Sequence, residues 1–352
     1  MRLSIETSFR FIARGGVTRY IVQLLKGLRE VAPDMAISEL CCAIPNFDYR
    51  QPRRSLVTAY REYFWTPLLV PRILSKQRPD IVHMTCFPDI PVPGGIPKVA
   101  TLHDLSQIRY PHAYRHYTRR RWRYLFNKMR EADAIISVSN FSKREAMELL
   151  EIPSDRIHTI HLAHTPVQPS AIPADLSALL PSRFFLFVGS LSPRKNLNLL
   201  IQTYRLADER RVKIPPLVVV GARVEGVARE SKPPSSWIFA GRVDDGVLAS
   251  LYSRAIALVY PSFYEGFGIP VLEAMAQNCP VICSPVASLP EAGGEAAFYA
   301  DQTPEAYLDA MVQLDQNHAL RQEFVEKGAK HIEAFSWQET ARRTLSVYQS
   351  LC

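Results

Sequence analysis

Long hydrophobic runs are missing from this sequence of 352 residues. No apolar run reaches the roughly 18 residues that a membrane-spanning helix needs. The first residues, MRLSIETSFRF, have neither the apolar core nor the small-residue cleavage site of a signal peptide. We therefore expect a protein that stays in the cytoplasm.

Metal-ligand and cofactor motifs are also scarce. The six cysteines are scattered, without C-x-x-C pairs or histidines at ligand spacing, which argues against a zinc site and a disulfide framework. A full G-x-G-x-x-G with an acidic residue on a following strand is absent too, so a dinucleotide-dependent dehydrogenase has little support. The sequence predicts neither a metal site nor a cofactor.

Size and charge point to two domains of different character. The length and the 47% hydrophobic content suit a globular protein with two filled cores. Residues 1–166 hold 25 Lys and Arg against 15 Asp and Glu, a net charge of +10, whereas residues 167–352 hold 17 against 19, a net charge of −2. A basic first half indicates an anionic partner, such as nucleic acid, acidic lipid or a phosphorylated substrate.

The stretch YPSFYEGFGIPVLEAMAQ (260–277) combines two carboxylates with a glycine turn and an expected helix start. The apolar run before it is typical of a buried parallel strand, and Gly266 and Gly268 allow a sharp turn into a helix that starts near Pro270. Unpaired amides at that helix start can hold a phosphate. The carboxylates of Glu265 and Glu273 repel phosphate and therefore suit hydroxyl groups. A phosphate site flanked by two hydroxyl-binding carboxylates indicates a nucleotide sugar as the ligand.

The motif E-G-F-G-x-P-x-L-E-A-M-A in this stretch resembles the E-x7-E signature of the retaining glycosyltransferases of family 4, which have the GT-B fold. The resemblance implies that Glu265 binds the donor sugar and Glu273 the nucleotide ribose. It also implies donor contacts from the turn between them, at Gly266, Phe267, Gly268 and Ile269. Taken singly, Glu265 is better explained as a solvated loop residue and Glu273 as a helix-dipole partner, and only their combination in the motif favours donor binding.

Other parts of the second half support the same resemblance. VGSLSPRKNL places Arg194 and Lys195 at a helix start and resembles the family motif in which the Lys binds the donor diphosphate. Many members have Arg directly after the Gly, where this chain has Ser190, so the second cation is expected to be Arg194 or to come from elsewhere. AGRVDD resembles the segment that holds the nucleotide base, which implies contacts near Val243. No D-x-D triplet occurs, so nothing indicates a metal that bridges the diphosphate.

The first half carries weaker motifs. Gly15 and Gly16 lie between an expected strand and a helix, where family members keep a glycine loop near the donor phosphates and the acceptor. A plain tight turn explains two adjacent glycines equally well. His103, in TLHDLS, ends an expected strand at the position where the family has a catalytic His near the anomeric carbon. A lone histidine there is otherwise a structural core residue.

A basic segment with interleaved aromatics, YRHYTRRRWRYLFNKMREADA (114–134), predicts a helix. Its cations, with Trp122, Tyr124 and Phe126, fit docking on an anionic membrane surface. The alternative is an ordinary amphipathic helix whose aromatics pack on the sheet.

The sequence as a whole predicts an α/β protein of the GT-B type, with two Rossmann-like domains that face each other across a cleft. We expect an acceptor-side domain at 1–166, joined by a C-terminal helix at about 336–352, and a donor domain at 167–335, with a proline-rich linker near 155–182. The resemblance implies retaining transfer of a mannose- or rhamnose-type hexose, from a GDP-linked donor to a lipid-diphosphate-linked glycan of bacterial O-antigen or other surface polysaccharide. The basic first half and its 114–134 segment lead us to expect peripheral attachment to the inner face of the plasma membrane. No base-reading motif is present, so we expect no nucleic acid partner. A UDP-sugar-dependent transferase of the same fold and a sugar-nucleotide epimerase remain alternatives, as does a sugar-nucleotide-binding protein without catalysis.

Overall fold

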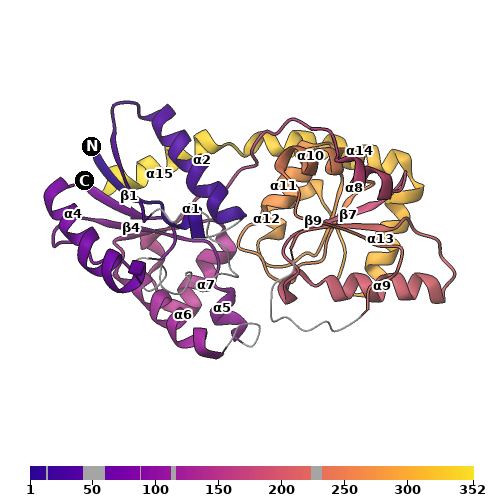
Figure 1. Cartoon of the computed structure of the whole chain (residues 1–352), viewed down its shortest axis with the longest axis horizontal. Coiled ribbons are helices and arrows are strands. Elements are labelled where there is room, and N and C mark those ends of the chain that lie inside the picture. Colours follow the sequence, from indigo (N-terminus) through magenta and orange to yellow (C-terminus); the bar gives the residue numbers. More distant parts are fainter. Residues whose placement is uncertain (13–14, 43–59, 88, 112–115, 223–231) are drawn as a thin grey trace. The chain divides into compact units, whose positions relative to one another are not determined.

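The chain folds into two compact α/β units. A computed structural model describes residues 1–12, 15–42, 60–87, 89–111, 116–222 and 232–352 (Figure 1). Unit 1 comprises residues Met1–Leu162 and Ser336–Cys352, and unit 2 comprises Ala163–Phe335. Within the described residues, no helix combines the length and the apolar character needed to cross a bilayer.

Unit 1 is built on a parallel sheet of six strands in the order β2-β1-β3-β4-β5-β6. The chain adds strands on one side of β1 and then on the other, which is the doubly wound pattern expected from alternating strands and helices. The strands are β1 (Arg2–Glu6), β2 (Ala36–Leu40), β3 (Ile81–Met84), β4 (Lys98–Leu102), β5 (Ala134–Ser137) and β6 (Ile157–Thr159).

Helices cover both faces of this sheet. Their bounds are α1 (Phe9–Ile12), α2 (Gly16–Val31), the π-helix η1 (Arg61–Leu69), α4 (Val70–Gln77), α5 (Ser106–Arg109), α6 (His116–Lys128), α7 (Asn140–Leu150) and α15 (Trp337–Leu351). Alternate strand residues point to opposite faces, so Ala100 and Leu102 pack in the core with α6 and α7, whereas Thr101 bonds to α2 on the other face. Ser139 caps α7, because its hydroxyl accepts the Ser142 amide at 3.0 Å.

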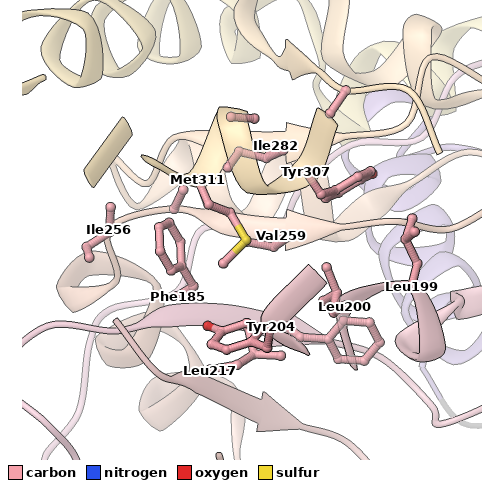
Figure 2. Close-up of a cluster of buried hydrophobic side chains, with 14 of the residues drawn as sticks. Phe185, Leu199, Leu200, Tyr204, Leu217, Ile256, Val259, Ile282, Tyr307 and Met311 are labelled. Carbon is pink, nitrogen blue, oxygen red and sulfur yellow. The ribbon is translucent and has the colours of Figure 1, made fainter. Parts of the chain in front are cut away.

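Unit 2 repeats the architecture with a second parallel sheet, in the order β12-β11-β10-β7-β8-β9. Its strands are β7 (Phe185–Val188), β8 (Leu217–Val220), β9 (Ile238–Gly241), β10 (Leu258–Tyr260), β11 (Val281–Cys283) and β12 (Phe298–Tyr299). Its α-helices are α8 (Ala174–Leu179), α9 (Leu197–Glu209), α10 (Asp245–Arg254), α11 (Ile269–Ala276), α12 (Leu289–Gly293), α13 (Pro304–Gln316) and α14 (His318–His331). Figure 2 shows the core between the strands and α9 and α13, with Phe185, Tyr204 and Met311 among its buried side chains.

The last helix, α15, belongs to unit 1 although the chain reaches it from unit 2, which confirms the predicted return of the C-terminal helix. A buried chain of hydrogen bonds fixes α15 on the sheet. Tyr348 of α15 bonds to His83 Nδ1 at 2.6 Å, His83 Nε2 bonds to Thr101 at 2.8 Å, and Thr101 bonds to Tyr20 of α2 at 2.8 Å. Burial lowers the pKa of His83 to about 3, so the imidazole is neutral in this chain of polar groups.

The structure differs from the sequence interpretation at three points. The segment near 155–182 is not a plain linker, because Ile157–Thr159 is the sixth strand of the first sheet and Ala174–Leu179 is a helix of unit 2. The units divide after Leu162, whereas the sequence placed the boundary at residue 166. The sequence offered Trp122 and Phe126 of α6 as membrane contacts. Phe126 is buried, Trp122 packs against the same core, and both rings contact Phe87, so neither is free to enter a membrane.

The contact between α2 and α15 generates a testable prediction at Gly27. A Cβ on Gly27 would lie 2.9 Å from Ala341 Cβ and 2.9 Å from the Trp337 carbonyl oxygen of α15. Replacing glycine by alanine inside a helix normally stabilises by about 0.5–1 kcal/mol. Here we expect Gly27→Ala to destabilise the chain by about 1–3 kcal/mol, because α15 must shift away.

Urea unfolding of the whole chain measures this change in free energy. Lys26→Ala is the control, because Lys26 lies beside Gly27 on α2 with its side chain 71% exposed. A Gly27→Ala chain as stable as the parent would show that the two helices tolerate a wider separation.

Candidate active site

The turn between β10 and α11 in unit 2 is held by its own backbone and by Ser288. Gly268 has a left-handed φ of 112° and precedes the first residue of α11, which explains the glycine at this point of the turn. The Ser288 hydroxyl donates to the carbonyl oxygens of Glu265 at 2.8 Å and Phe267 at 3.0 Å. The Ser288 side chain therefore holds the backbone on either side of Gly266.

A buried ion cluster lies at the start of this turn. The Glu265 carboxylate binds Lys195 Nζ through Oε1 at 2.5 Å and Arg194 Nη1 through Oε2 at 2.7 Å. Tyr260 donates its hydroxyl to Glu265 Oε1 at 3.0 Å and accepts a hydrogen bond from Lys195. Arg194 also donates to the Tyr264 carbonyl oxygen at 3.2 Å. Two cations against one carboxylate leave the cluster with one net positive charge.

Electrostatics keep Glu265 and Tyr260 each in one protonation state near neutral pH. Burial alone would raise the pKa of Glu265, but the charges of Arg194 and Lys195 and the hydrogen bond from Lys195 outweigh it and lower this pKa to about 2. Burial, together with the adjacent Glu265 carboxylate, raises the pKa of Tyr260 well above its usual range. Glu265 is therefore ionised and Tyr260 remains a hydrogen-bond donor.

Glycines at the ends of β7 and β8 let Lys195 reach the carboxylate. A Cβ on Gly189 would lie 3.2 Å from Lys195 Cε, so any side chain there would push the lysine stem aside. A Cβ on Gly221 would lie 1.8 Å from the Gly189 carbonyl oxygen, which excludes every other residue at that position. The Phe263 amide donates to the Arg194 carbonyl oxygen at 3.0 Å. The two predicted motifs, 70 residues apart, thus form one structure.

Glu273 occupies a different place from the one expected. A helix that starts near Pro270, as the sequence predicts, would have Glu273 in its first turn. The structure starts α11 at Ile269, so Glu273 is its fifth residue and belongs to the second turn. Its Oε2 accepts a hydrogen bond from Tyr252 of α10 at 3.4 Å, and the side chain is half-buried. Glu273 is therefore separate from the ion cluster but lies on the same strand–turn–helix element.

Residues predicted from the first half lie in unit 1. His103 follows β4 and donates its Nε2–H to the Thr85 carbonyl oxygen at 2.9 Å, because a carbonyl can only accept. Burial lowers the pKa of His103, so the ring is neutral and Nδ1 is its acceptor. The ring packs edge-on against Tyr20, with ring centroids 5.0 Å apart. Gly15, with a left-handed φ of 85°, and Gly16 lead into α2.

The structure adds three residues to the site that sequence reasoning did not single out: Tyr260, Ser288 and Tyr252. Only Tyr260 carried a sequence signal, since it ends the buried strand that leads into the motif. Val243 lies between β9 and the cap of α10, where the Asp244 carboxylate accepts the Val247 amide at 2.8 Å. Arg194, Lys195 and Glu265 are thus brought together within unit 2, whereas Gly15, Gly16 and His103 belong to unit 1.

Comparison with known proteins matches both units to glycosyltransferase families. Residues 172–331 match the family described as glycosyl transferases group 1, and residues 14–163 match glycosyltransferase family 4. The O-antigen chain mannosyltransferase B of Escherichia coli is 35% identical over 72% of this chain and 70% of that protein. The O-antigen chain mannosyltransferase RfbU of Salmonella typhimurium is 25% identical over 86% of this chain and 87% of its own length.

A solved structure shows the same fold over the whole chain. The sucrose-phosphate synthase of Thermosynechococcus elongatus superposes with a TM-score of 0.73 at 20% identity, covering 100% of this chain and 99% of that one. Its likeness supports the GT-B arrangement of two parallel six-stranded sheets with helices. On the matched motifs and relatives, the chain belongs to glycosyltransferase family 4 and has the GT-B fold.

Proposed function

We propose that this glycosyltransferase transfers a mannose- or rhamnose-type hexose from a GDP-linked donor to a lipid-diphosphate-linked glycan in O-antigen or related surface polysaccharide synthesis. The observation that carries the proposal is the buried cluster of Arg194, Lys195 and Glu265 at the carboxyl ends of β7 and β10. Ligands of parallel α/β sheets bind at this edge. The names of the two O-antigen mannosyltransferase relatives support the choice of sugar and pathway.

The cluster suits a negatively charged leaving group. Its one net positive charge lies beside the N-terminal end of α11, where the helix dipole also favours an anion. We propose that Arg194 and Lys195 hold the donor diphosphate and that Glu265, already ionised, accepts hydrogen bonds from sugar hydroxyls. Glu273 would bind the ribose and the segment near Val243 the base. In this proposal no metal is needed, because protein cations neutralise the leaving diphosphate.

We propose that transfer occurs with retention of anomeric configuration. The acceptor oxygen forms its bond to the anomeric carbon on the face from which the diphosphate oxygen departs, and the acceptor proton passes to that leaving oxygen. Lys195 and Arg194 stabilise the charge that develops on the diphosphate. The neutral His103, with Nδ1 as acceptor, would receive a hydrogen bond from a donor-sugar hydroxyl.

The proposal places the enzyme on the inner face of the plasma membrane, where a lipid-linked acceptor is available. The exposed cations of α6 would face anionic lipid there. A sugar-nucleotide epimerase of similar fold is the second candidate, and it differs by converting the free sugar nucleotide without any acceptor.

The first prediction from this proposal concerns Lys195. We expect Lys195→Met to lower turnover by about two orders of magnitude. The variant keeps an apolar stem of similar length but removes one of the two cations that stabilise the leaving diphosphate. Lys327→Met is the matched control, since Lys327 is a half-exposed lysine of the same unit whose contacts with Glu323 and the Phe324 ring lie on its own helix. Product anomeric configuration is read by NMR. Undiminished turnover in Lys195→Met, or an inverted product, contradicts the mechanism.

The second prediction concerns the nucleotide. Donor binding stabilises the folded state by mass action, by about 2.7 kcal/mol at a concentration 100 times the dissociation constant. We expect GDP and GDP-mannose to raise the thermal midpoint more than UDP, ADP and their sugars at the same concentration. Glu273→Gln should reduce the GDP shift, because it removes the carboxylate assigned to the ribose. A larger shift with UDP would overturn the GDP assignment but leave the transferase assignment standing.

A further inference from the structure

The outer face of η1 exposes five large apolar side chains in ten consecutive positions. They are Tyr60 (47% exposed), Tyr63 (70%), Phe64 (57%), Leu68 (46%) and Leu69 (37%), which we call the η1 outer face. The described residues contain thirteen exposed large hydrophobic side chains in all, so more than a third of them gather on this one short element. The rings of Tyr60 and Phe64 stack with centroids 6.4 Å apart, which makes the face continuous. An exposed apolar cluster of this size marks an interaction surface.

The inner side of η1 is firmly held, so this exposure follows from the fold. Trp65 is buried in the core with Val70 and Leu74 of α4. Arg61 is buried as well, with its guanidinium carbon 4.7 Å from the centre of the Phe9 ring and Nη2 3.6 Å from Asp89 Oδ2.

Buried and exposed residues alternate regularly along η1. The Val70 amide donates to the Trp65 carbonyl oxygen, five residues back, in the pattern of a π-helix. Tyr60, Phe64 and Leu68, spaced four residues apart, are exposed, whereas Arg61 and Trp65 are buried.

Cations adjoin this apolar face. Arg121 of α6 forms an ion pair with Glu62, which is the sole acidic residue of η1, so the two helices are joined at this point. The sequence of α6 has no Asp or Glu, and Arg120, Arg121 and Arg123 are all exposed. Tyr124, 58% exposed, lies beside them with Lys128 Nζ 5.6 Å from the centre of its ring. The surface therefore combines exposed aromatic and leucine side chains with several positive charges.

We propose that the η1 outer face inserts into the interfacial region of an anionic lipid bilayer while the arginines of α6 bind the lipid headgroups. The inference rests on the proposed function in one respect: a lipid-linked acceptor supplies the reason for membrane attachment. Aromatic and leucine side chains with adjacent Arg and Lys are the composition of interfacial membrane elements. An anionic bilayer matches both parts of the surface, because its headgroups pair with the cations and its acyl boundary takes the aromatic and leucine side chains. The apolar anchor is thus η1 rather than Trp122 and Phe126 of α6, which are packed inside.

Vesicle sedimentation of the full chain tests the surface. The vesicles contain equal parts of phosphatidylglycerol and phosphatidylcholine, or phosphatidylcholine alone, at low and high salt. We expect the triple variant Tyr63→Ser, Phe64→Ser, Leu68→Ser to bind the anionic vesicles about tenfold or more weakly at both salt concentrations, because apolar insertion is not screened. We expect Arg120→Glu with Arg123→Glu to weaken binding mainly at low salt, by about fivefold or more for each lost cation.

The matched control is Val22→Ser with Met147→Ser. Val22 (46% exposed) on α2 and Met147 (41%) on α7 are exposed apolar side chains of the same unit but lie outside η1. The control should bind the anionic vesicles like the parent. Equal binding by the triple variant and the parent, or an equal loss in the control, overturns the proposal.

A second readout detects insertion directly and does not depend on the stability of the triple variant. The single variant Phe64→Trp places an indole on the η1 outer face, and its emission should shift to the blue on addition of anionic vesicles. The reference is Val22→Trp, which should not shift beyond the parent. An unshifted Phe64→Trp spectrum in a chain that still sediments with vesicles would show purely electrostatic attachment and overturn the insertion.

The thermal shift by GDP separates this inference from the proposed function, because it measures nucleotide binding and not lipid binding. A chain that responds to GDP but ignores vesicles contradicts the lipid surface and leaves the donor assignment standing. A chain that binds vesicles through η1 but responds to no sugar nucleotide contradicts the donor assignment only.

Discussion

The buried pairing of Lys195 with Glu265 is the interaction on which the candidate site depends. A lone carboxylate or ammonium in that position would carry a large desolvation cost, whereas the pair, completed by Arg194 and Tyr260, satisfies each charged group. The pair also explains Gly189, because a Cβ there would crowd the lysine stem, while Gly221 allows its own backbone to approach the Gly189 carbonyl oxygen. Removing Glu265 would leave the buried Lys195 without this carboxylate, and removing Lys195 would leave Arg194 as the remaining cation on Glu265. The site and the local fold are therefore stabilised by the same contacts.

Unit 1 shows the same reliance on buried polar contacts at a different place. The C-terminal helix is fixed there by the chain of hydrogen bonds through Tyr348, His83, Thr101 and Tyr20, and by the close approach that Gly27 allows. These contacts specify where α15 lies along α2, which apolar packing alone leaves less defined. His103 contacts the edge of Tyr20, so the proposed sugar-binding histidine and the docked helix share a neighbour.

On the outer surface of unit 1, α6 supplies the positive charges and η1 supplies the exposed apolar side chains. In α6, Leu125, Phe126 and Met129 fill the core and the arginines face outward, so this helix offers charge but little apolar surface. In η1 the buried anchor is Trp65 and the outward side chains are apolar. The ion pair between Arg121 and Glu62 joins them into one amphipathic surface.

The sequence by itself determined the alternation of strands and helices in both units, because buried parallel strands and amphipathic helices have strong local patterns. It also determined that Arg194, Lys195, Glu265 and Glu273 are candidate donor-binding residues, through two specific motifs. Only the tertiary structure decided that Lys195 and Arg194 share the carboxylate of Glu265, that Tyr260 completes the cluster, and that residues 157–159 form a sheet strand. It also decided that Phe126 is buried while Phe64 is exposed. Local patterns cannot encode these outcomes, because each depends on which distant segment the fold packs against that residue.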